Sequence, residues 1–400
     1  MKTAGIIAEY NPFHKGHAYM LSEVRKSGFD ACVAVMSGSF VQRGDVGICS
    51  KWARAEMALH GGIDLVVELP VCYSMAGAQP FASAGVALLA ALGVDGLCFG
   101  SEKGELAGLE YAAELLSSAK FEEALAGELK KGSTFAAARQ AALTLFDSGT
   151  AALLSQPNNT LAIEYLLAAR RMNAPFEAFT VKRLGAAHDG EAEAEQFASA
   201  SQIRQKILSG GDISGLVPGS TAEILRREMQ NSHAPADISR QERIVLAELR
   251  CMSLNDFAKL PDVSEGLEHR LYAAARQATG IDDFLARCKT KRYTMARLRR
   301  LMFSAFLGLD NSLPQSPPYI KVLGFGPKGA EILKRVKKTV SLPVLTKPAA
   351  IKMLGADAQM VFDCESRAQD LWNLFVPQPT VCGADYLTSP IKITEEKTCQ

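Results

Sequence analysis

The sequence predicts an α/β protein with a Rossmann-like parallel sheet, followed by a helical region and a small C-terminal α/β unit. Three observations lead to this prediction. Short apolar runs alternate with helical patterns over the first 100 residues, and these runs contain no regular polar alternation. A proline-rich connector then precedes a second strand–helix–strand pattern near the C-terminus. Unbroken apolar runs are typical of strands that are buried on both faces of a parallel sheet.

The first part of the chain supplies the elements of the predicted sheet. Its short apolar runs predict strands at Ala4–Ala8, Cys32–Met36, Leu65–Leu69 and Leu97–Phe99. Helical patterns lie between these runs at His17–Lys26, Trp52–His60 and Phe81–Leu92. Repetition of strand, helix and strand at this spacing implies right-handed βαβ units, and therefore a parallel sheet.

Helical patterns continue after the fourth strand. Alanine-rich stretches predict helices at Leu106–Ser118, Phe121–Leu129 and Phe135–Leu145, and a further strand is expected at Phe176–Val181. An acidic segment follows at Asp189–Glu195, which we interpret as a solvated loop in preference to a functional lid. A helix then begins near Ser201.

Glycine and proline suggest where this first unit ends. Gly210-Gly211-Asp212 and Pro218-Gly219 are typical of a boundary, so we expect an N-terminal core at residues 1–212. Residues 213–312 are mostly helical in pattern, and a proline-rich connector spans Asn311–Pro318. Residues 313–400 form the predicted C-terminal unit, with a strand at Tyr319–Gly324, a helix at Pro327–Lys338 and a strand at Leu342–Leu345.

Composition and charge set broad limits. With 48% hydrophobic and 22% charged residues, the chain is typical of a soluble globular protein. The formal net charge of +1 provides no global attraction to nucleic acid, so any RNA contact must come from a local patch. The nine cysteines include no C-x-x-C pair, which favours reduced core thiols and no metal site. The longest apolar stretch, near Val86–Leu92, is too short to span a membrane, and we expect a cytoplasmic protein.

The first motif with a chemical meaning directly follows the first predicted strand. Asn11-Pro12-Phe13-His14-Lys15-Gly16-His17 contains the pattern H-x-G-H. From the histidine and glycine content, this pattern would occur by chance roughly 0.007 times per chain of this length. Its position adds to its meaning, because a strand-to-helix turn at the carboxyl end of a parallel strand is where this fold class binds nucleotides.

The physical chemistry of such a turn favours a polyphosphate ligand. The N-terminus of a helix offers free N–H groups and the positive end of its dipole. His14 and His17 can both face the anion, and Gly16 allows close approach. Attack on the α-phosphorus of ATP, with pyrophosphate leaving, mainly needs positioning and charge stabilisation, so neither imidazole has to be a base. The alternative is that both histidines only cap the helix.

A second motif is expected to meet the first. Ser199-Ala200-Ser201-Gln202-Ile203-Arg204 resembles the I-S-S-T-x-I-R pattern with which H-x-G-H nucleotidyltransferases hold the β- and γ-phosphates. Hydroxyl groups such as that of Ser201 can donate to phosphate oxygens, and Arg204 supplies positive charge. The alternative interpretation is an ordinary S-x-x-Q helix start.

The residues between the two motifs indicate a particular family. The chain contains Glu9-Tyr10-Asn11-Pro12-Phe13 before the first histidine, then Met36–Gly44, Asp64–Pro70, Phe99–Glu102 and Pro157–Leu161. In this order and spacing the segments resemble the tRNA(Met) cytidine acetate ligase family of the H-x-G-H nucleotidyltransferase superfamily. The resemblance runs through the first 210 residues and more loosely through Lys289–Arg300, so it covers at least half of the chain.

The resemblance implies a reaction in two steps. Acetate attacks the α-phosphate of ATP to give acetyl-adenylate and pyrophosphate, and the N4 amine of the wobble cytidine of elongator tRNA(Met) then takes the acetyl group. ATP is the substrate, with Mg²⁺ carried by the nucleotide. Activation has to come first, because acetate is a poor electrophile and the delocalised cytidine amine is a weak nucleophile.

The resemblance also implies which residues contact ATP. These are Ile7, Ala8, Glu9, Tyr10, Asn11, Pro12, Phe13, His14, Lys15, Gly16, His17, Ala18, Tyr19 and Met20, together with Gly100, Asn158 and Arg183. Two of the positions remain open by one residue, with Asn159 as the alternative to Asn158 and Lys182 as the alternative to Arg183.

A basic segment in the helical region is the candidate RNA surface. Between Arg287 and Arg300 the chain has seven lysine and arginine residues and no acidic residue. The candidate RNA-binding residues are Lys289, Lys291, Arg292, Tyr293, Arg297 and Arg300, with Tyr293 available for stacking on a base. The alternative is a solvated helix face whose other side, Met295, Leu298 and Met302, is packed. A lesser candidate is the basic helix Lys328–Lys338.

Two other functions have to be weighed against this one. A nucleotidyltransferase that joins AMP to a phosphorylated cofactor precursor would share both motifs, but such enzymes are compact, and about 190 residues follow the predicted core here. An ATP-binding RNA scaffold without activity would be expected to lack one of the histidines or Arg204, and all three are present.

Overall fold

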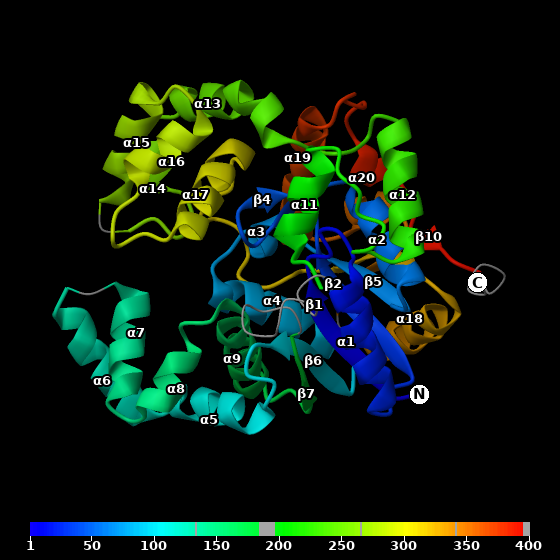
Figure 1. Cartoon of the computed structure of the whole chain (residues 1–400), viewed down its shortest axis with the longest axis horizontal. Helices are drawn as coiled ribbons and strands as arrows, with labels where there is room; N and C mark the ends of the chain where they lie inside the picture. The colour runs from blue at the N-terminus through cyan, green and yellow to red at the C-terminus, as the bar shows by residue number, and fades with distance from the viewer. Residues whose placement is uncertain (133, 184–196, 265, 341, 395–400) are drawn as a thin grey trace.

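The computed structural model describes residues 1–132, 134–183, 197–264, 266–340 and 342–394 (Figure 1). The predicted strands and helices are present within these ranges, with small differences at their ends. The acidic segment Asp189–Glu195 lies outside the described residues.

The sheet is centred on the first strand of the chain. Strand β1 (Thr3–Ala8) lies between β2 (Ala31–Ser37) and β6 (Gly96–Ser101), and it pairs in parallel with both. Strand β5 (Leu65–Leu69) lies beyond β2, and β7 (Glu177–Lys182) lies beyond β6. The chain therefore builds the sheet outward from β1 in one direction and then returns to add β6 on the other side. In open α/β sheets, ligands bind at the carboxyl ends of the strands at such a switch point.

Both faces of the sheet are buried, as the unbroken apolar runs predicted. Val33 and Val35 of β2 pack into one core with α4 (Ala78–Ala91), α5 (Leu106–Leu116) and α9 (Pro157–Arg171). Cys32, Ala34 and Met36 pack into a second core with α1 (Lys15–Lys26), α2 (Lys51–His60), α11 (Ala200–Leu208) and α12 (Gly219–Gln230). Successive side chains of a strand point to opposite faces, so two apolar cores require a continuous apolar strand.

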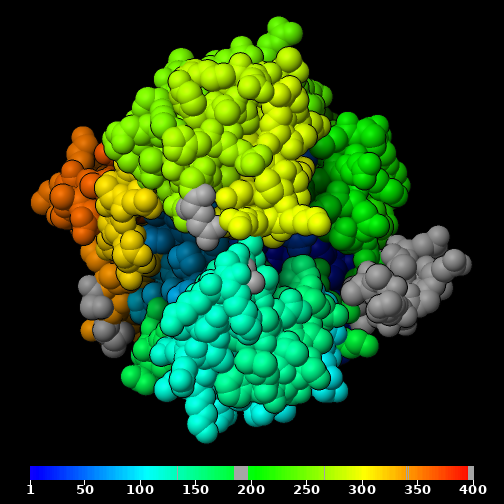
Figure 2. Space-filling model, turned by 90° about the vertical axis from the view of Figure 1, so that its left-hand side faces the viewer, coloured from blue at the N-terminus to red at the C-terminus, as the bar shows by residue number. Residues whose placement is uncertain are grey.

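Two groups of helices project from the sheet (Figure 1). The first contains α6 (Ala119–Lys130), α7 (Phe135–Thr144) and α8 (Ser148–Leu153). The second contains α13 (Glu242–Cys251), α14 (Leu254–Ala258), α15 (Leu267–Gln277), α16 (Ile281–Cys288) and α17 (Met295–Leu307). Figure 2 shows a hollow between the cyan α5–α7 side and the yellow-green α13–α17 side, with blue N-terminal residues visible at its bottom.

The second helical group has a core of its own, which includes part of the N-terminal chain. Phe40 and Val46 belong to a short antiparallel hairpin of β3 (Phe40–Val41) and β4 (Asp45–Val46), and both side chains pack among the helices α13–α17. Trp372 of α19 (Ala356–Trp372) packs there too and donates from Nε1 to the Gly47 carbonyl oxygen over 2.8 Å. The hairpin therefore connects the helical group to the carboxyl end of the sheet.

The C-terminal segment contains the predicted strand–helix–strand pattern, and its strands extend the N-terminal sheet. Strand β8 (Ile320–Phe325) pairs antiparallel with β5, so it extends the N-terminal sheet. Two short strands, β9 (Val344–Leu345) and β10 (Ile391–Lys392), pair in parallel with β8. Helix α18 (Pro327–Thr339) follows β8, as predicted. The predicted boundary at residue 312 therefore separates segments that share one sheet.

A buried cluster of charges lies where the two ends of the chain meet. The Lys51 ammonium lies 2.6 Å from Glu68 of β5, 2.9 Å from Glu365 of α19 and 2.8 Å from Asp385 of α20 (Ala384–Leu387). Lys321 of β8 pairs with Glu68 at 2.8 Å and also with Asp385. Loss of one member would leave uncompensated buried charge, so this cluster holds the C-terminal segment against the sheet.

Candidate nucleotide-binding site

The turn between β1 and α1 brings both motif histidines to the switch point. Helix α1 begins at Lys15, and His14 occupies its N-cap position. The His14 backbone N–H donates to Nδ1 of His17 over 3.2 Å, so the proton of a neutral His17 ring is on Nε2. The two imidazoles are stacked, with ring centroids 3.7 Å apart. The His17 side chain therefore caps the His14 N–H, whereas Nδ1 of His14 has no hydrogen-bond partner among the described residues.

Both histidines are held neutral by their surroundings. Burial, together with a smaller effect of the positive charge of Arg183, lowers the pKa of His14 to about 4. Burial lowers the pKa of His17 well below its ordinary value, with smaller contributions from His14 and Arg183. Neutral imidazoles remain hydrogen-bond donors, so they can stabilise charge on a phosphate without titrating at neutral pH. Gly16 permits this arrangement, since a Cβ atom there would lie 2.9 Å from Cε1 of His14.

Hydrogen bonds with Arg54, Ile48 and Val46 hold the turn in place. Arg54 of α2 donates from Nη1 to the Glu9 carbonyl oxygen over 2.7 Å. The Asn11 side chain accepts from the Ile48 N–H at 2.7 Å and donates to the Val46 carbonyl oxygen at 3.0 Å. Tyr10 has a positive φ of 43°, which turns its ring into the core against Phe13 and His17. A turn fixed in this way keeps Glu9 and His14 in defined positions.

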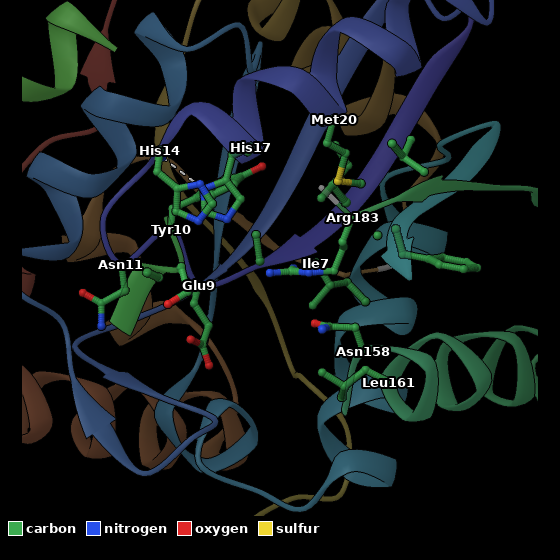
Figure 3. Close-up of a pocket in the computed structure, with 18 of the residues that line it drawn as sticks. Ile7, Glu9, Tyr10, Asn11, His14, His17, Met20, Asn158, Leu161 and Arg183 are labelled. Carbon is green, nitrogen blue, oxygen red and sulfur yellow. Dashed lines mark hydrogen bonds between the residues drawn. The ribbon is translucent and has the colours of Figure 1, made fainter. Parts of the chain in front are cut away.

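A cavity of about 360 Å³ opens beside this turn (Figure 3). Many of the residues predicted to contact ATP line it: Ile7, Ala8, Glu9, Tyr10, Asn11, His14, Gly16, His17, Tyr19, Met20, Gly100, Asn158, Arg183, Ser201 and Arg204. Four predicted residues lie outside its lining, namely Pro12, Phe13, Lys15 and Ala18. Phe13 is fully buried against Gly61, so it supports the turn from behind.

The opposite wall of the cavity comes from β6, β7 and α9. Asn158 lines the cavity and donates from Nδ2 to Glu102 over 2.6 Å. Asn159 is fully buried, and its Oδ1 accepts from the backbone N–H groups of Glu102 and Lys103. The geometry therefore favours Asn158 over Asn159 as a ligand contact. In Figure 3 the Asn158 side chain is directed toward the cavity.

The geometry also favours Arg183 over Lys182 as a ligand contact. Both line the cavity, but the Lys182 side chain is exposed, whereas Arg183 is largely covered and extends into the cavity in Figure 3. Burial lowers the pKa of Arg183, with an opposing contribution from Glu102. Among the described residues, none accepts a hydrogen bond from its guanidinium group. A largely buried arginine that has no hydrogen-bond acceptor among the described residues is suited to bind an anionic ligand.

The second motif does meet the first, as predicted. Ser199 caps α11 by accepting from the Gln202 N–H, so the alternative of an S-x-x-Q helix start is also correct. Arg204, one turn further along α11, donates to the Asn11 carbonyl oxygen over 3.0 Å and pairs with Asp45 at 3.1 Å. Ser201 and Arg204 both line the cavity. The two motifs therefore form one surface.

Some residues of the cavity had no predicted role. Gln42 and Arg43, at the tip of the β3–β4 hairpin, line it beside Glu9, and Phe99, Tyr165 and Phe197 contribute aromatic surface. The segment Met36–Gly44 carried the family resemblance, but only the folded hairpin shows that Arg43 reaches the cavity. Asp45 was also missed, because its pairing with Arg204 joins residues distant in sequence.

Some of the candidate RNA-binding residues are exposed, and others contact other parts of the chain. Lys291 and Arg292 are exposed in the turn before α17. Arg297 pairs with Asp262 at 3.2 Å, and Arg300 donates to the Gln42 carbonyl oxygen over 3.3 Å. Lys289 donates to the Tyr293 carbonyl oxygen. The expectation that Tyr293 can stack on a base is wrong for this conformation, because its side chain is 6% exposed and belongs to the helical core.

The hairpin tip links this basic segment to the cavity. Gly44 has a positive φ of 73°, and a Cβ atom there would lie 2.5 Å from Cβ of Arg299. The hairpin and α17 therefore touch at a position where only glycine fits easily. Arg43, the residue before Gly44, lines the cavity. The hairpin tip therefore touches the basic segment on one side and the cavity on the other. Figure 2 shows the yellow part of the helical group at the rim of the hollow.

None of the described helices is both long enough and apolar enough to cross a membrane. No cluster of three or more His, Cys, Asp or Glu side chains with the geometry to hold a metal ion occurs within residues 1–132, 134–183, 197–264, 266–340 and 342–394.

Comparisons with known proteins agree with this geometry. The HIGH Nucleotidyl Transferase family matches residues 1–384. A tRNA(Met) cytidine acetate ligase of Thermoanaerobacter sp. strain X514 is 38% identical, and one of Caldanaerobacter subterraneus subsp. tengcongensis is 39% identical; in both cases the match covers 98% of this chain and 100% of the relative. The crystal structure of Thermotoga maritima TmcAL bound with alpha-thio ATP is 32% identical, with a TM-score of 0.91 over 98% of this chain and 100% of that chain.

Proposed function

The chain belongs to the tRNA(Met) cytidine acetate ligase family of HIGH nucleotidyl transferases, and from this premise we propose that it is an ATP-dependent ligase that acetylates N4 of the wobble cytidine of elongator tRNA(Met). The observation that carries the proposal is the cavity at the switch point, where His14, His17 and Arg204 from two distant motifs line one open volume. The product is N4-acetylcytidine.

The first step is the activation of acetate. An acetate oxygen attacks the α-phosphorus of ATP, an oxygen–phosphorus bond forms, and the bond to pyrophosphate breaks. The neutral imidazoles of His14 and His17 donate hydrogen bonds to the phosphate as charge develops, and Ser201 and Arg204 hold the leaving pyrophosphate. Gly100 and Asn158 hold the nucleoside side of ATP, and Arg183 offers its guanidinium group to the phosphates. Mg²⁺ would be carried by the nucleotide and would supply further positive charge beside its phosphates.

The second step is the transfer of the acetyl group to RNA. The anticodon loop has to reach the cavity from outside, and the exposed basic residues Lys291 and Arg292 lie beside the hairpin that leads there. We propose that Lys289, Lys291, Arg292, Arg297 and Arg300 form the RNA surface, and that contact with phosphates positions the loop. An enzyme that modifies tRNA would act in the cytoplasm.

The proposed function is tested by exchange of labelled pyrophosphate into ATP. The protein is incubated with ATP, pyrophosphate and a panel of carboxylates and phosphorylated cofactor precursors, without RNA. Exchange that depends on acetate supports the ligase. Exchange only with a phosphorylated precursor would support a cofactor-precursor adenylyltransferase, and no exchange with any compound would contradict both enzymes.

A further inference from the structure

Glu9 places a carboxylate in the nucleotide cavity, and none of the described residues donates a hydrogen bond to it. Its backbone carbonyl is fixed by Arg54, and the neighbouring Tyr10 side chain is buried in the core. The Glu9 side chain therefore extends on the cavity side of the turn, where Figure 3 shows its carboxylate pointing away from the stacked rings of His14 and His17. We propose that this carboxylate is the base that accepts the proton of the cytidine amine during acetyl transfer.

Other acidic groups beside the cavity are already engaged. Both carboxylate oxygens of Glu102 accept hydrogen bonds from Asn158 and Asn159 at the start of α9. Asp45 pairs with Arg204 at 3.1 Å. By contrast, no described residue donates a hydrogen bond to the Glu9 carboxylate or forms an ion pair with it within 4.0 Å. A carboxylate that is directed into a cavity and not used by the fold is available to a substrate.

The histidines are less suitable as the base. Nδ1 of His17 already accepts the His14 N–H, and burial lowers the pKa of both rings, which makes them weak proton acceptors. Burial raises the pKa of Glu9 above that of an ordinary glutamate. Arg43 of the hairpin, Arg204 of α11 and Arg54 of α2 oppose this rise, and Asp45 adds to it. Tyr165 of α9 also lines the cavity, and burial and the charge of Glu9 raise the pKa of its hydroxyl group. A raised pKa brings a carboxylate nearer to the range of an effective base.

The position of Glu9 also fits the direction from which RNA would arrive. The hairpin tip lies beside Glu9, and its Gln42 carbonyl oxygen accepts from Arg300 of α17. A cytidine that enters from the basic segment therefore passes Arg43 before it meets the acetyl group. Glu9 therefore lies close to the hairpin, where the charges of Arg43 and Asp45 act on its carboxylate.

The chemistry requires a base in the second step only. Acetate is already an anion at neutral pH, so its attack on the α-phosphorus releases no proton. In the transfer, the amine nitrogen forms a bond to the acetyl carbon, the bond from that carbon to the AMP oxygen breaks, and AMP leaves as an anion. The nitrogen must then lose one proton, and the Glu9 carboxylate takes it. This inference rests on the proposed function and assigns one residue to its second step.

The test is Glu9→Gln, which keeps the size of the side chain and removes its basicity. Transfer from supplied acetyl-adenylate to saturating elongator tRNA(Met) is measured in single turnovers across a pH series, beside acetate-dependent pyrophosphate exchange. We expect transfer to fall by about 10²-fold or more and exchange to fall by less than about tenfold. Wild-type transfer should slow as pH falls through the raised pKa of Glu9, and the variant should lose this dependence. Asp45→Asn is the matched control, and it should slow exchange at least as much as transfer because it releases Arg204.

The possible outcomes separate this inference from the proposed function. Wild-type protein without acetate-dependent exchange or transfer would overturn the proposed function itself. If wild type is active and Glu9→Gln transfers the acetyl group at the wild-type rate, Glu9 is not the base. A parallel loss of exchange and transfer would also overturn the inference and assign Glu9 to nucleotide binding. A pH dependence of transfer that is the same in wild type and in Glu9→Gln would also overturn the inference.

Discussion

Arg204 donates a hydrogen bond from Nη1 to the backbone carbonyl oxygen of Asn11 over 3.0 Å, although the two residues are 193 positions apart. This bond joins the second motif to the turn of the first. It also leaves Arg204 beside the cavity, where its second nitrogen pairs with Asp45. One side chain therefore fixes the shape of the turn and presents positive charge to the ligand.

Substitution of Arg204 should affect the two steps of the reaction unequally. Because Arg204 is proposed to hold the leaving pyrophosphate, Arg204→Ala should slow adenylate formation by about 10²-fold, and transfer from supplied acetyl-adenylate should fall far less. Lys206→Ala, which removes an exposed cation from the same helix, should change neither step appreciably. Pre-steady-state measurement of both steps checks this. Equal losses would mean that Arg204 acts through the fold or through RNA.

Removal of either motif histidine should stop the first step. His14→Ala or His17→Ala deletes a hydrogen-bond donor aimed at the developing phosphate charge, and we expect acetate-dependent exchange to fall by about 10²–10³-fold. His269→Ala, at a 70% exposed side chain in the helical group, is the control. Circular dichroism establishes that the variants are folded. A folded variant with near-normal exchange would remove these residues from the mechanism.

The neutral histidines should make stability depend on pH. Burial lowers the pKa of His14 to about 4 in the folded protein, while the unfolded chain titrates near the ordinary value. The stability that the neutral His14 ring contributes is therefore fully present above the pKa of the unfolded chain. It is lost as pH falls through the pKa of the folded protein. Between about pH 5.5 and 4.5, the free energy of unfolding of wild type should fall more steeply than that of His14→Gln, by up to about 1.4 kcal/mol per pH unit. Urea unfolding across this range measures both slopes, and parallel slopes would contradict the argument.

The basic segment should serve RNA binding and not adenylation. Lys291→Ala combined with Arg292→Ala should weaken tRNA binding and lower its log–log salt slope by roughly one to two units, because each phosphate contact releases a counterion. The more extensive replacement of Lys291, Arg292, Arg297 and Arg300 should have a larger effect. Titration of tRNA at several salt concentrations checks this, with pyrophosphate exchange on the same preparations as the control for folding. Unchanged affinity and slope would make the segment a solvated helix face, and the Lys328–Lys338 helix would be tested next.

Much of the site could be predicted because its parts are local. The H-x-G-H turn, the unbroken apolar strands and the Ser199–Arg204 helix start are each written in a short stretch of sequence. Their meeting follows from the rule that ligands bind where a parallel sheet changes direction. The pairing of β8 with β5 could not be predicted in this way, since it joins segments about 250 residues apart and reverses the strand direction.

The surroundings of individual side chains also could not be predicted from the sequence. The run of charges around Tyr293 indicated an exposed aromatic ring, but Tyr293 is an apolar contact of the helical core. The buried group of Lys51, Glu68, Lys321, Glu365 and Asp385 left no local pattern either, because each member lies in a different element and only the fold brings them together. Arg43 reaches the cavity only because Gly44 lets the hairpin approach α17.

The most direct test of the account is the reaction itself. Purified protein is incubated with ATP, labelled acetate and elongator tRNA(Met), and the tRNA is digested to nucleosides for mass spectrometry. A second tRNA carries uridine in place of the wobble cytidine. The account predicts N4-acetylcytidine in the first tRNA, in an amount that depends on both ATP and acetate, and no acetylated nucleoside in the second. Label that fails to enter the first tRNA, or that enters both tRNAs equally, would contradict it.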